Sequence, residues 1–380
     1  MKIVLLGATG SIGTSACKCI RRFPGKFQIV GLSTNNNTER LAPLIREFRP
    51  AAICIGNGGR REPQDGGEGT VRVFRGEKGL EELVNETEFD VLLNALVGAV
   101  GLRATVAALK KKKRVALANK ESLVIGGELI TELIGNGLGE IIPIDSEHSA
   151  ILQCLCGENR ENLESIILTA SGGPFREIEI DKLKYITPGD ALNHPTWSMG
   201  RKITVDSATL MNKGFEVIEA HHLFHLSYDN IRVLIHPQSI IHSMVEFHDG
   251  AVMAQMGVPD MELPIQFALG FPHRLPLKGK RLNLAAIKSL TFFEPDFKRF
   301  PCLKLCIDAA RQGGTAPAIL NAANEMAVKF FLEGTIGYLS IAEIIEAALN
   351  GHASHKIDGI ETIERTDAAV RNDLIKRYAT

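Results

Sequence analysis

Three carboxylates, those of Asp145, Glu147 and Glu216, lie in a stretch that also supplies hydroxyl, amide and ammonium groups. Asp145 and Glu147 directly follow the apolar segment 140–144, and an i, i+2 spacing at a strand end can put both side chains on one side. Glu216 follows Gly214 on a segment that we expect to be helical. Three carboxylates without a cysteine suit Mg²⁺ or Mn²⁺ better than zinc. Surface acids, two of them capping helices, would give the same spacing, so both interpretations stay open at this point.

A second group of polar residues in the same stretch suits a phosphate. Ser171-Gly172-Gly173 ends a predicted strand, and its hydroxyl and exposed N–H groups suit an anion. Ser207, Asn212 and Lys213 add a hydroxyl, an amide and an ammonium. Taken singly, these residues could also be ordinary caps and turns. Taken with the carboxylates, they indicate an enzyme that holds a metal beside the phosphate of a small sugar phosphate.

A glycine-rich turn near the N-terminus has the residue types that a dinucleotide requires. Residues 7–13 read Gly-Ala-Thr-Gly-Ser-Ile-Gly and join a predicted strand to a predicted helix. Glycines at this spacing permit a tight turn and let backbone N–H groups approach a pyrophosphate at the start of the helix. The alternative is a turn that only packs the helix on the strand. The position of this glycine motif after the first strand of a βαβ unit favours nucleotide binding.

The end of the second predicted strand favours NADP over NAD. NAD-binding sheets usually carry a carboxylate there, which holds the ribose 2′-hydroxyl. This chain instead has Asn35, Asn36 and Asn37. Neutral amides do not repel a 2′-phosphate, and Arg40 could add a positive charge.

Strands and helices alternate along the first 144 residues, a pattern that predicts a doubly wound parallel sheet of the Rossmann type. We expect strands at 2–7, 27–33, 51–55, 71–74, 90–95, 114–118 and 140–144, and helices at 12–22, 38–48, 79–85, 100–112 and 121–135. The glycine-rich residues 56–69 are expected to form a surface loop.

The alternation ends after residue 144. Strands expected at 165–169, 233–235, 244–248 and 252–256, with a hairpin at Asp249-Gly250, predict a central part of the α+β class. Helices expected at 303–311, 316–332, 340–349 and 362–378 predict a C-terminal helical bundle. We therefore expect an α/β protein with four parts: a nucleotide-binding domain at 1–148, a catalytic domain at 149–275, a linker at 276–302 and a helical domain at 303–380.

Trp197, the one tryptophan, lies in a polar loop bounded by proline and glycine. A core tryptophan would lie on a regular element, so we expect residues 185–200 to form a lid over a ligand. His221, His222 and His225 could bind zinc, but histidines on a helix surface are the commoner case. His242, in an apolar stretch, is expected to be structural.

Composition excludes several classes of protein. The 380 residues can bury the cores of two or three domains, and a net charge of −1 gives no field that would recruit nucleic acid or an anionic membrane. The basic run Lys110–Arg114 is expected to be the solvated end of a helix. No apolar run reaches the ~18–20 residues of a membrane helix. The cysteine pairs have C-x-C spacing, which indicates buried, reduced thiols. We expect a cytoplasmic enzyme.

Seven motifs in the same order resemble the 1-deoxy-D-xylulose 5-phosphate reductoisomerase family over nearly the whole chain. They include Pro-Ile-Asp-Ser-Glu-His and Asp-Ser-Ala-Thr-Leu-Met-Asn-Lys-Gly-Phe-Glu, and they lie at 7–13, 118–122, 143–148, 171–176, 194–202, 206–216 and 236–243. Several long motifs in the right order are more specific than any one of them.

The resemblance implies a role for individual residues. The metal ligands would be Asp145, Glu147 and Glu216. The catalytic groups would be Lys120, Glu147, His194 and Trp197. The substrate would contact Lys120, Ser146, Glu147 and Glu216, and its phosphate end would contact Ser171, His194, Ser207, Asn212 and Lys213. The cofactor would be lined by Thr9, Gly10, Ser11, Ile12, Asn35, Asn36, Asn37, Asn119, Glu121 and Gly200. Many family members have a lysine or arginine near Asn36, and this chain departs from that pattern.

The activity that the resemblance implies is NADPH- and metal-dependent. It rearranges 1-deoxy-D-xylulose 5-phosphate to a branched aldehyde and reduces this to 2-C-methyl-D-erythritol 4-phosphate, in the non-mevalonate route to isoprenoid precursors. The metal would be Mg²⁺ or Mn²⁺, and the assembly a homodimer.

Two other classes of protein fit part of the sequence. A different two-domain NADP-dependent oxidoreductase, acting on an aldehyde or semialdehyde, would not need a metal. A regulator that binds a nucleotide without catalysis would not need three carboxylates together with a phosphate site.

Overall fold

The structure, a computed structural model, describes residues 1–56, 71–194, 197 and 199–378. Residues 57–69 of the predicted surface loop and residues 195, 196 and 198 of the predicted lid lie outside the described residues. The chain divides into two units. Unit 1 comprises Met1–Ser122, Ile130–Ser149 and Asp260–Lys278, and unit 2 comprises Leu123–Leu129, Ala150–Pro259 and Gly279–Thr380.

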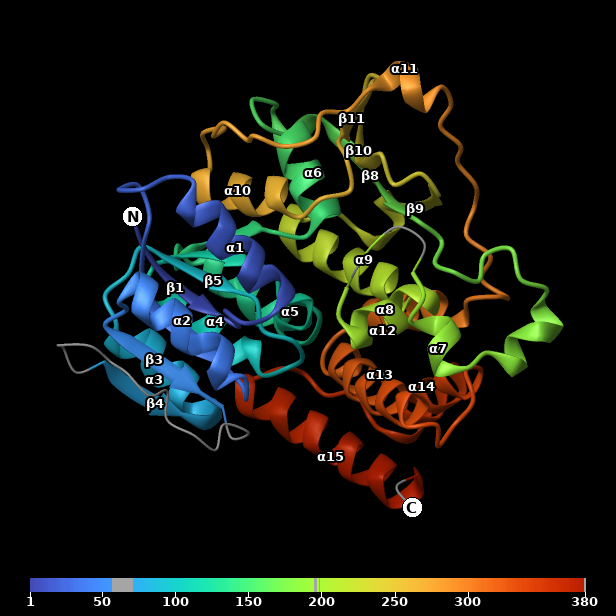
Figure 1. The fold of residues 1–380 in the computed structure, drawn as a ribbon. Coiled ribbons are helices and arrows are strands. Elements are labelled where there is room, and N and C mark those ends of the chain that lie inside the picture. Colours follow the sequence, from blue (N-terminus) through green and yellow to red (C-terminus); the bar gives the residue numbers. More distant parts are fainter. Residues whose placement is uncertain (57–70, 195–196, 198, 379–380) are drawn as a thin grey trace. The chain divides into compact units, whose positions relative to one another are not determined.

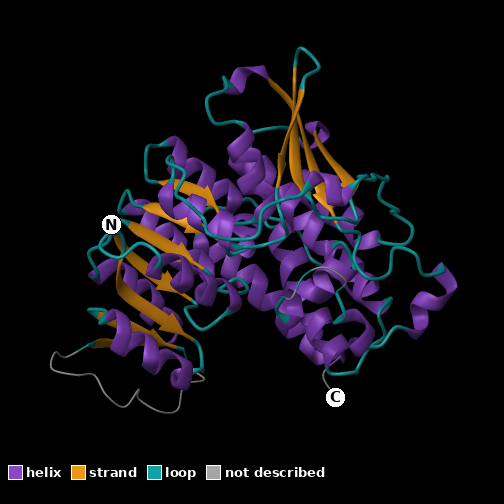
Figure 2. Cartoon of the chain, turned by 45° about the horizontal axis from the view of Figure 1, so that its top comes forward, coloured by secondary structure: helices purple, strands orange, loops and turns teal. Residues whose placement is uncertain are grey.

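Unit 1 is built on a seven-stranded parallel sheet with the order β4-β3-β2-β1-β5-β6-β7 (Figures 1 and 2). Its strands are β1 (Lys2–Leu6), β2 (Gln28–Thr34), β3 (Ala52–Ile55), β4 (Arg72–Arg75), β5 (Val91–Asn94), β6 (Arg114–Leu117) and β7 (Glu140–Pro143). Helices cover both faces of such a sheet, and its central strands are therefore continuously apolar. In β1, Ile3, Val4, Leu5 and Leu6 are all fully buried. The predicted Rossmann-type sheet is confirmed.

The strand order reverses between β1 and β5, and this point determines where a ligand can bind. The connecting helices are α1 (Ser11–Arg21), α2 (Thr38–Phe48), α3 (Gly76–Glu86), α4 (Gly101–Lys110) and α5 (Lys120–Gly135). Because crossovers are right-handed, α1 and α2 lie on one face, and α3 packs with α4 on the other. In sheets of this kind the ligand crevice lies at the carboxyl ends of the strands, beside the reversal.

A helix from far along the chain completes unit 1. Helix α10 (Glu262–Gly270) packs against α1, β6 and β7. Arg22, directly after α1, forms an ion pair with Glu262, the first residue of α10, at 2.6 Å. This helix has no clear signal in the sequence, because it is short, is apolar on most sides and carries Pro264 in its first turn.

Unit 2 contains a four-stranded mixed sheet with the order β11-β10-β8-β9. Its strands are β8 (Leu163–Ala170), β9 (Ile231–Ile235), β10 (Ile241–Phe247) and β11 (Val252–Met256). Strands β10 and β11 form the predicted hairpin, in which Gly250 takes the left-handed conformation (φ +83°). Helix α9 (Met211–Phe224) packs against β8 and β9. The prediction of an α+β central part is confirmed.

The C-terminal helices of unit 2 gather around α13 (Ala316–Leu332), which contacts α12 (Pro301–Gln312), α14 (Ser340–Gly351) and α15 (Ile360–Tyr378). Helix α13 also contacts α8 (Arg201–Ala208). Because neighbours surround it, most of its residues are buried, including Asn321 and Asn324. The predicted C-terminal helical bundle is confirmed, and its central helix reaches the segment that carries Ser207.

The basic run Lys110–Arg114 lies at the end of α4, and the cysteines lie in both units. The basic run after α4 is a helix end, and Lys111 additionally donates to three carbonyl oxygens at the end of α3, at 2.8 to 3.1 Å. All seven cysteines are free and six are buried; Cys156 is exposed, because it lies beyond the end of α6 (Ser146–Cys154). Among the described residues, no helix has the length and apolar character to cross a membrane.

Candidate active site

The glycine-rich turn of unit 1 lies at the carboxyl end of β1, beside the reversal of strand order. Gly7 has a φ of +76°, and a Cβ on it would lie 2.4 Å from the carbonyl oxygen of Ala95, which follows β5. A Cβ on Gly13 would lie 2.3 Å from the carbonyl oxygen of Gly7. Only glycine allows this close packing of backbone on backbone, which brings the start of α1 to the edge where a pyrophosphate binds. The predicted cofactor residues here are Thr9, Gly10, Ser11 and Ile12.

The three asparagines after β2 differ in their contacts and exposure. Asn37 is the N-cap of α2, and its side-chain oxygen accepts a hydrogen bond from the N–H of Arg40 at 3.1 Å. Asn35 and Asn36 are exposed at the strand tip. Nearby, the hydroxyls of Thr9 and Thr34 are 2.7 Å apart. The strand tip formed by Asn35 and Asn36 is therefore neutral and polar.

Asn119 fixes the start of α5. Its oxygen accepts from the N–H of Ser122 at 3.1 Å, and its amide donates to two carbonyl oxygens of the loop after β5, at 3.0 and 3.1 Å. The amide also donates to Glu121 at 3.0 Å. Asn119, Glu121 and Ser122 are buried. Because Lys120 is the first residue of α5, this network sets the direction in which Lys120 leaves the sheet.

Lys120 forms a buried ion pair with Asp145, which follows β7. The ring Nδ1 of the fully buried His148 lies 3.3 Å from the other oxygen of Asp145. Burial raises the pKa of Asp145, but the attraction of Lys120 and the hydrogen bond and charge of His148 outweigh it, so this pKa lies well below its usual range. Asp145 is therefore ionised at neutral pH, as a metal ligand must be.

The chain turns into a helix one residue after Asp145. Helix α6 begins at Ser146, so Glu147 lies in its first turn and not in an extended strand end. The hydroxyl of Ser146 donates to Glu147, and the N–H of Glu147 donates to Asp145 at 3.2 Å. The prediction that an i, i+2 strand spacing directs the two carboxylates is wrong. The start of a helix instead brings them together.

In unit 2, Ser171 and His194 meet. The hydroxyl oxygen of Ser171 lies 3.2 Å from Nε2 of His194, and Nδ1 of His194 accepts from the N–H of Trp197 at 2.9 Å. Burial lowers the pKa of His194, which favours the neutral ring. A neutral ring that accepts at Nδ1 carries its proton on Nε2, so His194 donates to Ser171. The N–H of Gly173 also points to this oxygen, at 3.3 Å. The hydroxyl proton of Ser171 is thus left to donate to another acceptor, such as a phosphate oxygen.

A second set of predicted residues lies at the junction of α8 and α9. Ser207 is near the end of α8, and Asn212 and Lys213 are in the first turn of α9. The amide of Asn212 donates to one oxygen of Glu216 at 2.6 Å, and the ammonium of Lys213 contacts the other. Glu216 and Lys213 are almost completely buried. The structure thus brings Asn212, Lys213 and Glu216 together on one turn of helix.

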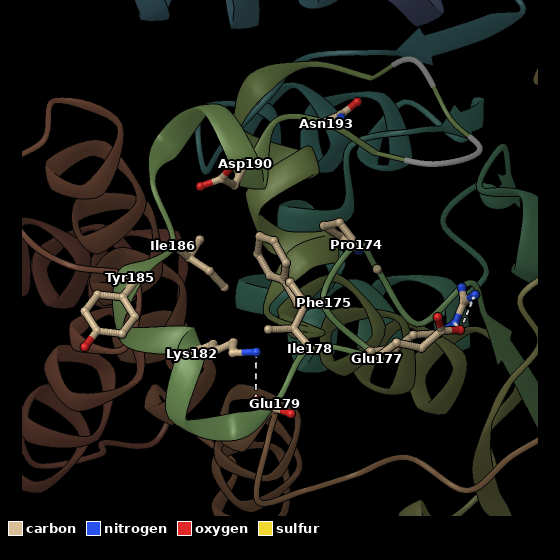
Figure 3. Close-up of a pocket in the computed structure, with 12 residues that line it drawn as sticks. Pro174, Phe175, Glu177, Ile178, Glu179, Lys182, Tyr185, Ile186, Asp190 and Asn193 are labelled. Carbon is tan, nitrogen blue, oxygen red and sulfur yellow. Dashed lines mark hydrogen bonds and ion pairs between the residues drawn. The ribbon is translucent and has the colours of Figure 1, made fainter.

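A cavity of about 770 Å³ lies within the stretch that joins Ser171 to His194. Its lining residues all come from 173–193, and Figure 3 shows Phe175, Ile178 and Ile186 pointing toward one another inside it. At its rim Lys182 pairs with Glu179 at 2.9 Å. The cavity therefore adjoins the stretch that ends at His194, whose ring is held by its hydrogen bonds to Ser171 and Trp197.

The other histidines singled out from the sequence have structural contacts. His221 stacks on Tyr228, with ring centroids 4.2 Å apart, and donates to the carbonyl oxygen of Leu226 at 2.6 Å. Burial, together with the neighbouring His221 and His225, lowers the pKa of His222 to about 3. His242 is buried, with its ring centroid 6.4 Å from that of Trp197. The prediction that His221 to His225 lie on a helix surface holds only in part, because His222 packs inward against Gly127.

Comparisons with known proteins agree with this arrangement. A family model described as 1-deoxy-D-xylulose 5-phosphate reductoisomerase matches residues 3–127, and models of C-terminal domains of the same enzyme match residues 141–224 and 256–373. A relative from Pelotomaculum thermopropionicum that bears this name is 49% identical over 379 residues, covering 98% of this chain and 97% of the relative. This chain belongs to the 1-deoxy-D-xylulose 5-phosphate reductoisomerase family.

Other members of the reductoisomerase family are similarly close. One from Chloroherpeton thalassium is 49% identical over 373 residues, covering 97% of this chain and 96% of its own. A crystal structure of DOX-P reductoisomerase in complex with NADPH, fosmidomycin and magnesium is 38% identical, covers 100% of this chain and 98% of its own, and superposes with a TM-score of 0.94. The enzyme from Zymomonas mobilis in complex with NADPH is also 38% identical, covers 99% and 98%, and has a TM-score of 0.91.

The reductoisomerase motifs also hold residues to which sequence reasoning gave no role. Asp206 and His148 lie within these motifs beside predicted site residues, and both polar side chains are buried. A buried polar residue next to a predicted ligand is a signal that could have identified them. Asn324 and Tyr338 carried no such signal, since they lie more than 100 residues from the groups that they contact.

Proposed function

We propose that this chain is an NADPH- and divalent-metal-dependent 1-deoxy-D-xylulose 5-phosphate reductoisomerase. It converts its ketose phosphate to 2-C-methyl-D-erythritol 4-phosphate, a step toward isoprenoid precursors. The observation that carries the proposal is the full-length likeness to a reductoisomerase solved with NADPH, fosmidomycin and magnesium. The reaction rearranges the carbon skeleton to a branched aldehyde, by a retro-aldol and aldol pair or by an α-ketol shift. Hydride from NADPH then reduces the aldehyde.

The glycine-rich edge of unit 1 fits NADPH. Gly7 and Gly13 leave no room for a Cβ, and the start of α1 can therefore meet a pyrophosphate directly. NADPH supplies the hydride when it is bound. The proposed contacts are Thr9, Gly10, Ser11, Ile12, Asn35, Asn36, Asn37, Asn119, Glu121 and Gly200. The neutral tip formed by Asn35 and Asn36 supports acceptance of a 2′-phosphate, because it carries no carboxylate that would repel it.

Asp145, Glu147 and Glu216 are the proposed metal ligands, and each offers one carboxylate oxygen. A donor set made only of oxygens fits Mg²⁺ or Mn²⁺. When bound, such an ion supplies Lewis-acid polarisation of a carbonyl group and lowers the pKa of a neighbouring hydroxyl. Lys120 adds a buried positive charge that can stabilise negative charge on a substrate oxygen. Ser146 would bind the polar end of the substrate, and Glu147 would also move protons.

The phosphate end is proposed to consist of Ser171, His194, Ser207, Asn212 and Lys213. The hydrogen bonds of His194 and Gly173 to Ser171 support this, because they leave the Ser171 hydroxyl proton pointing outward. Phosphate contacts are remote from the reacting carbons, so their binding energy can be used to order the site around the substrate.

We also propose that residues 185–200 act as a lid and that Trp197 covers the substrate. Support comes from the half-buried Trp197, whose N–H holds His194. The functional division keeps the boundaries expected from the sequence: nucleotide binding at 1–148, catalysis at 149–275, a linker at 276–302 and helices at 303–380.

A homodimer and a cytoplasmic location complete the proposal. Strand β11 is an edge of its sheet, and Val252 and Met253 on it are 49% and 41% exposed. An apolar edge strand invites pairing with a second copy across a two-fold axis. All seven cysteines are free, which suits a reducing compartment.

The test is NADPH oxidation by the purified protein with 1-deoxy-D-xylulose 5-phosphate, with Mg²⁺ or Mn²⁺ and again with EDTA. We expect turnover that stops when the metal is removed. Turnover of an aldehyde or semialdehyde that EDTA does not affect would instead identify another NADP-dependent oxidoreductase. Binding of NADPH without turnover of any of these would overturn the substrate assignment.

A further inference from the structure

The two segments that supply the proposed phosphate contacts touch backbone to backbone in unit 2. Gly173 has a φ of +67°, and a Cβ on it would lie 2.7 Å from the carbonyl oxygen of Ser207. A residue with a side chain would therefore push Ser207 away from the segment that begins at Ser171. The relative position of Ser171 and Ser207 depends on this contact, and so on whatever holds Ser207 in place.

The turn after Ser207 is strained and needs support. Leu210 lies between α8 and α9 in the left-handed conformation, with a φ of +57°. A leucine in this region costs of order 1 kcal/mol or more and persists only where the surroundings fix it. The turn determines how Ser207, at the end of α8, is oriented relative to Asn212 and Lys213, at the start of α9.

Tyr338, from the loop that joins α13 to α14, holds this turn. Its buried hydroxyl donates to the carbonyl oxygen of Ala208 at 2.7 Å. Its ring packs edge-on against Phe175, with centroids 5.2 Å apart, and against Phe331 at 6.1 Å. Tyr338 thus contacts both segments, the turn through its hydroxyl and the stretch after Ser171 through its ring.

Asp206 is the second point at which the helices hold this segment. The amide of Asn324, on α13, donates to its carboxylate at 2.8 Å. Lys202 pairs with the other carboxylate oxygen at 2.9 Å. Asp206 is only 2% exposed. A buried carboxylate is costly unless it is fully paired, so the position of the end of α8 depends on Asn324 and Lys202.

We propose that Asp206, Asn324 and Tyr338 are positioning residues for the phosphate group of the substrate. They act through the turn and not by contact with the substrate. The C-terminal helices thereby set the spacing at which Ser207 and Asn212 meet a phosphate. This inference rests on the proposed function only for the identity of the phosphate compound, because inorganic phosphate probes the same subsite.

The chain offers a matched pair of variants for the test. Asn321 and Asn324 are one turn apart on α13, and both are fully buried. The Asn321 amide donates to Glu325, on α13 itself, at 3.1 Å, whereas the Asn324 amide donates to Asp206, beside the turn between α8 and α9. Asn324→Leu and Asn321→Leu should therefore lower the melting temperature similarly. Tyr338→Phe, with Tyr378→Phe as its control, removes one hydroxyl and keeps the ring.

We expect Asn324→Leu and Tyr338→Phe to raise KM for the sugar phosphate and the Kd for inorganic phosphate, measured by ³¹P NMR titration, by about tenfold. This change corresponds to about 1.4 kcal/mol. The Kd for NADPH should stay unchanged, and the two controls should keep the wild-type KM. An equal rise of KM in a variant and its control, or unchanged phosphate binding in both Asn324→Leu and Tyr338→Phe, would overturn the proposal. If Asn324→Leu does not fold, Tyr338→Phe decides alone. If the wild-type protein turns over no sugar phosphate but binds inorganic phosphate, only the proposed function fails.

Discussion

The hydroxyl of Ser171 lies 3.2 Å from Nε2 of His194, and the N–H of Trp197 points to the other ring nitrogen at 2.9 Å. One backbone donor therefore selects the tautomer of His194, and the tautomer determines whether Ser171 accepts or donates in their hydrogen bond. Ser171 accepts from His194 and keeps its own proton to donate. Protonation of His194 would put a second N–H at Nδ1, facing that of Trp197, and would break the arrangement. Because burial lowers the pKa of His194, this protonation requires a more acidic solution than an exposed histidine would need.

We predict that Ser171→Ala raises KM for the sugar phosphate about ten- to a hundredfold, because a hydrogen bond to a charged group is worth about 1.5–3 kcal/mol. The Kd for NADPH should not change. The control is Ser165→Ala on β8, the strand that Ser171 directly follows, and its hydroxyl donates to Glu246 at 2.8 Å. Steady-state kinetics measure KM for the sugar phosphate, and titrations measure the Kd for NADPH. If Ser165→Ala raises KM as much, the effect belongs to the strand and not to a phosphate contact.

Gly13→Ala should weaken NADPH binding by about tenfold or more, about 1.4 kcal/mol. Its Cβ would lie 2.3 Å from the carbonyl oxygen of Gly7, so the turn would have to move. Gly135→Ala is the control, since a Cβ there meets no atom within 4 Å. That change should stabilise α5 slightly, by about 0.5–1 kcal/mol. Fluorescence titration with NADPH separates the two variants, and equal affinities would remove the glycine turn from the cofactor site.

Glu216→Gln should raise the Mg²⁺ concentration needed for half-maximal activity far more than it changes NADPH affinity, because it removes a proposed metal ligand and its charge. Glu219→Gln is a stringent control, since Glu219 is also buried and lies almost one turn along the same helix. Mg²⁺ activation curves for the two variants give the answer. Equal loss of Mg²⁺ activation and of NADPH affinity in a folded Glu216→Gln protein would refute the assignment.

Acid should destabilise the protein through His222, whose pKa is lowered to about 3. The unfolded chain binds this proton near the ordinary histidine pKa of about 6.5, so stability is fully present above that pH. Each pH unit below it, down to about 3, removes about 1.4 kcal/mol, or about 2 kcal/mol between pH 7 and pH 5. His222→Leu should flatten this dependence, as followed by urea denaturation at both pH values. His248→Gln is the exposed control and should keep the wild-type slope. Parallel slopes for wild type and His222→Leu would contradict the prediction.

Met253→Lys should weaken the proposed homodimer. Met253 is exposed on the edge strand β11, and a charge there opposes pairing with a second copy. Light scattering after size exclusion should give a lower mass for this variant at low protein concentration. Ile375→Lys, at an exposed position of α15, should leave the mass unchanged. A monomeric wild-type protein at all concentrations would exclude the dimer.

The sheet of unit 1 could be predicted from sequence because parallel strands buried on both faces are continuous apolar runs, as in Ile3 to Leu6. Helix α10 could not, because it is short and apolar on most sides, and its partner α1 lies about 240 residues away. The carboxylates Asp145 and Glu147 were found by residue type and not by correct local geometry, since a helix begins at Ser146. Residue types therefore indicate the proposed ligands but not the local structure that positions them.

The residues that hold the turn after Ser207 could not be predicted from the sequence for a different reason. The amide of Asn324 reaches Asp206 across 118 residues, and the hydroxyl of Tyr338 reaches Ala208 across 130. Neither residue type nor spacing indicates such a pair, because a buried asparagine in a helical bundle has many possible partners. Only the packing of α13, and of the loop that joins α13 to α14, against the α8 segment identifies these pairs.

In the proposed reaction, this chain couples a carbon-skeleton rearrangement to hydride transfer with a divalent metal. The most direct measurement follows 1-deoxy-D-xylulose 5-phosphate by ³¹P NMR while NADPH oxidation is recorded in the same sample with Mg²⁺. We predict one molecule of 2-C-methyl-D-erythritol 4-phosphate for each NADPH consumed, and no conversion after EDTA. A reduced product that keeps the unbranched skeleton, or turnover that survives EDTA, would contradict it.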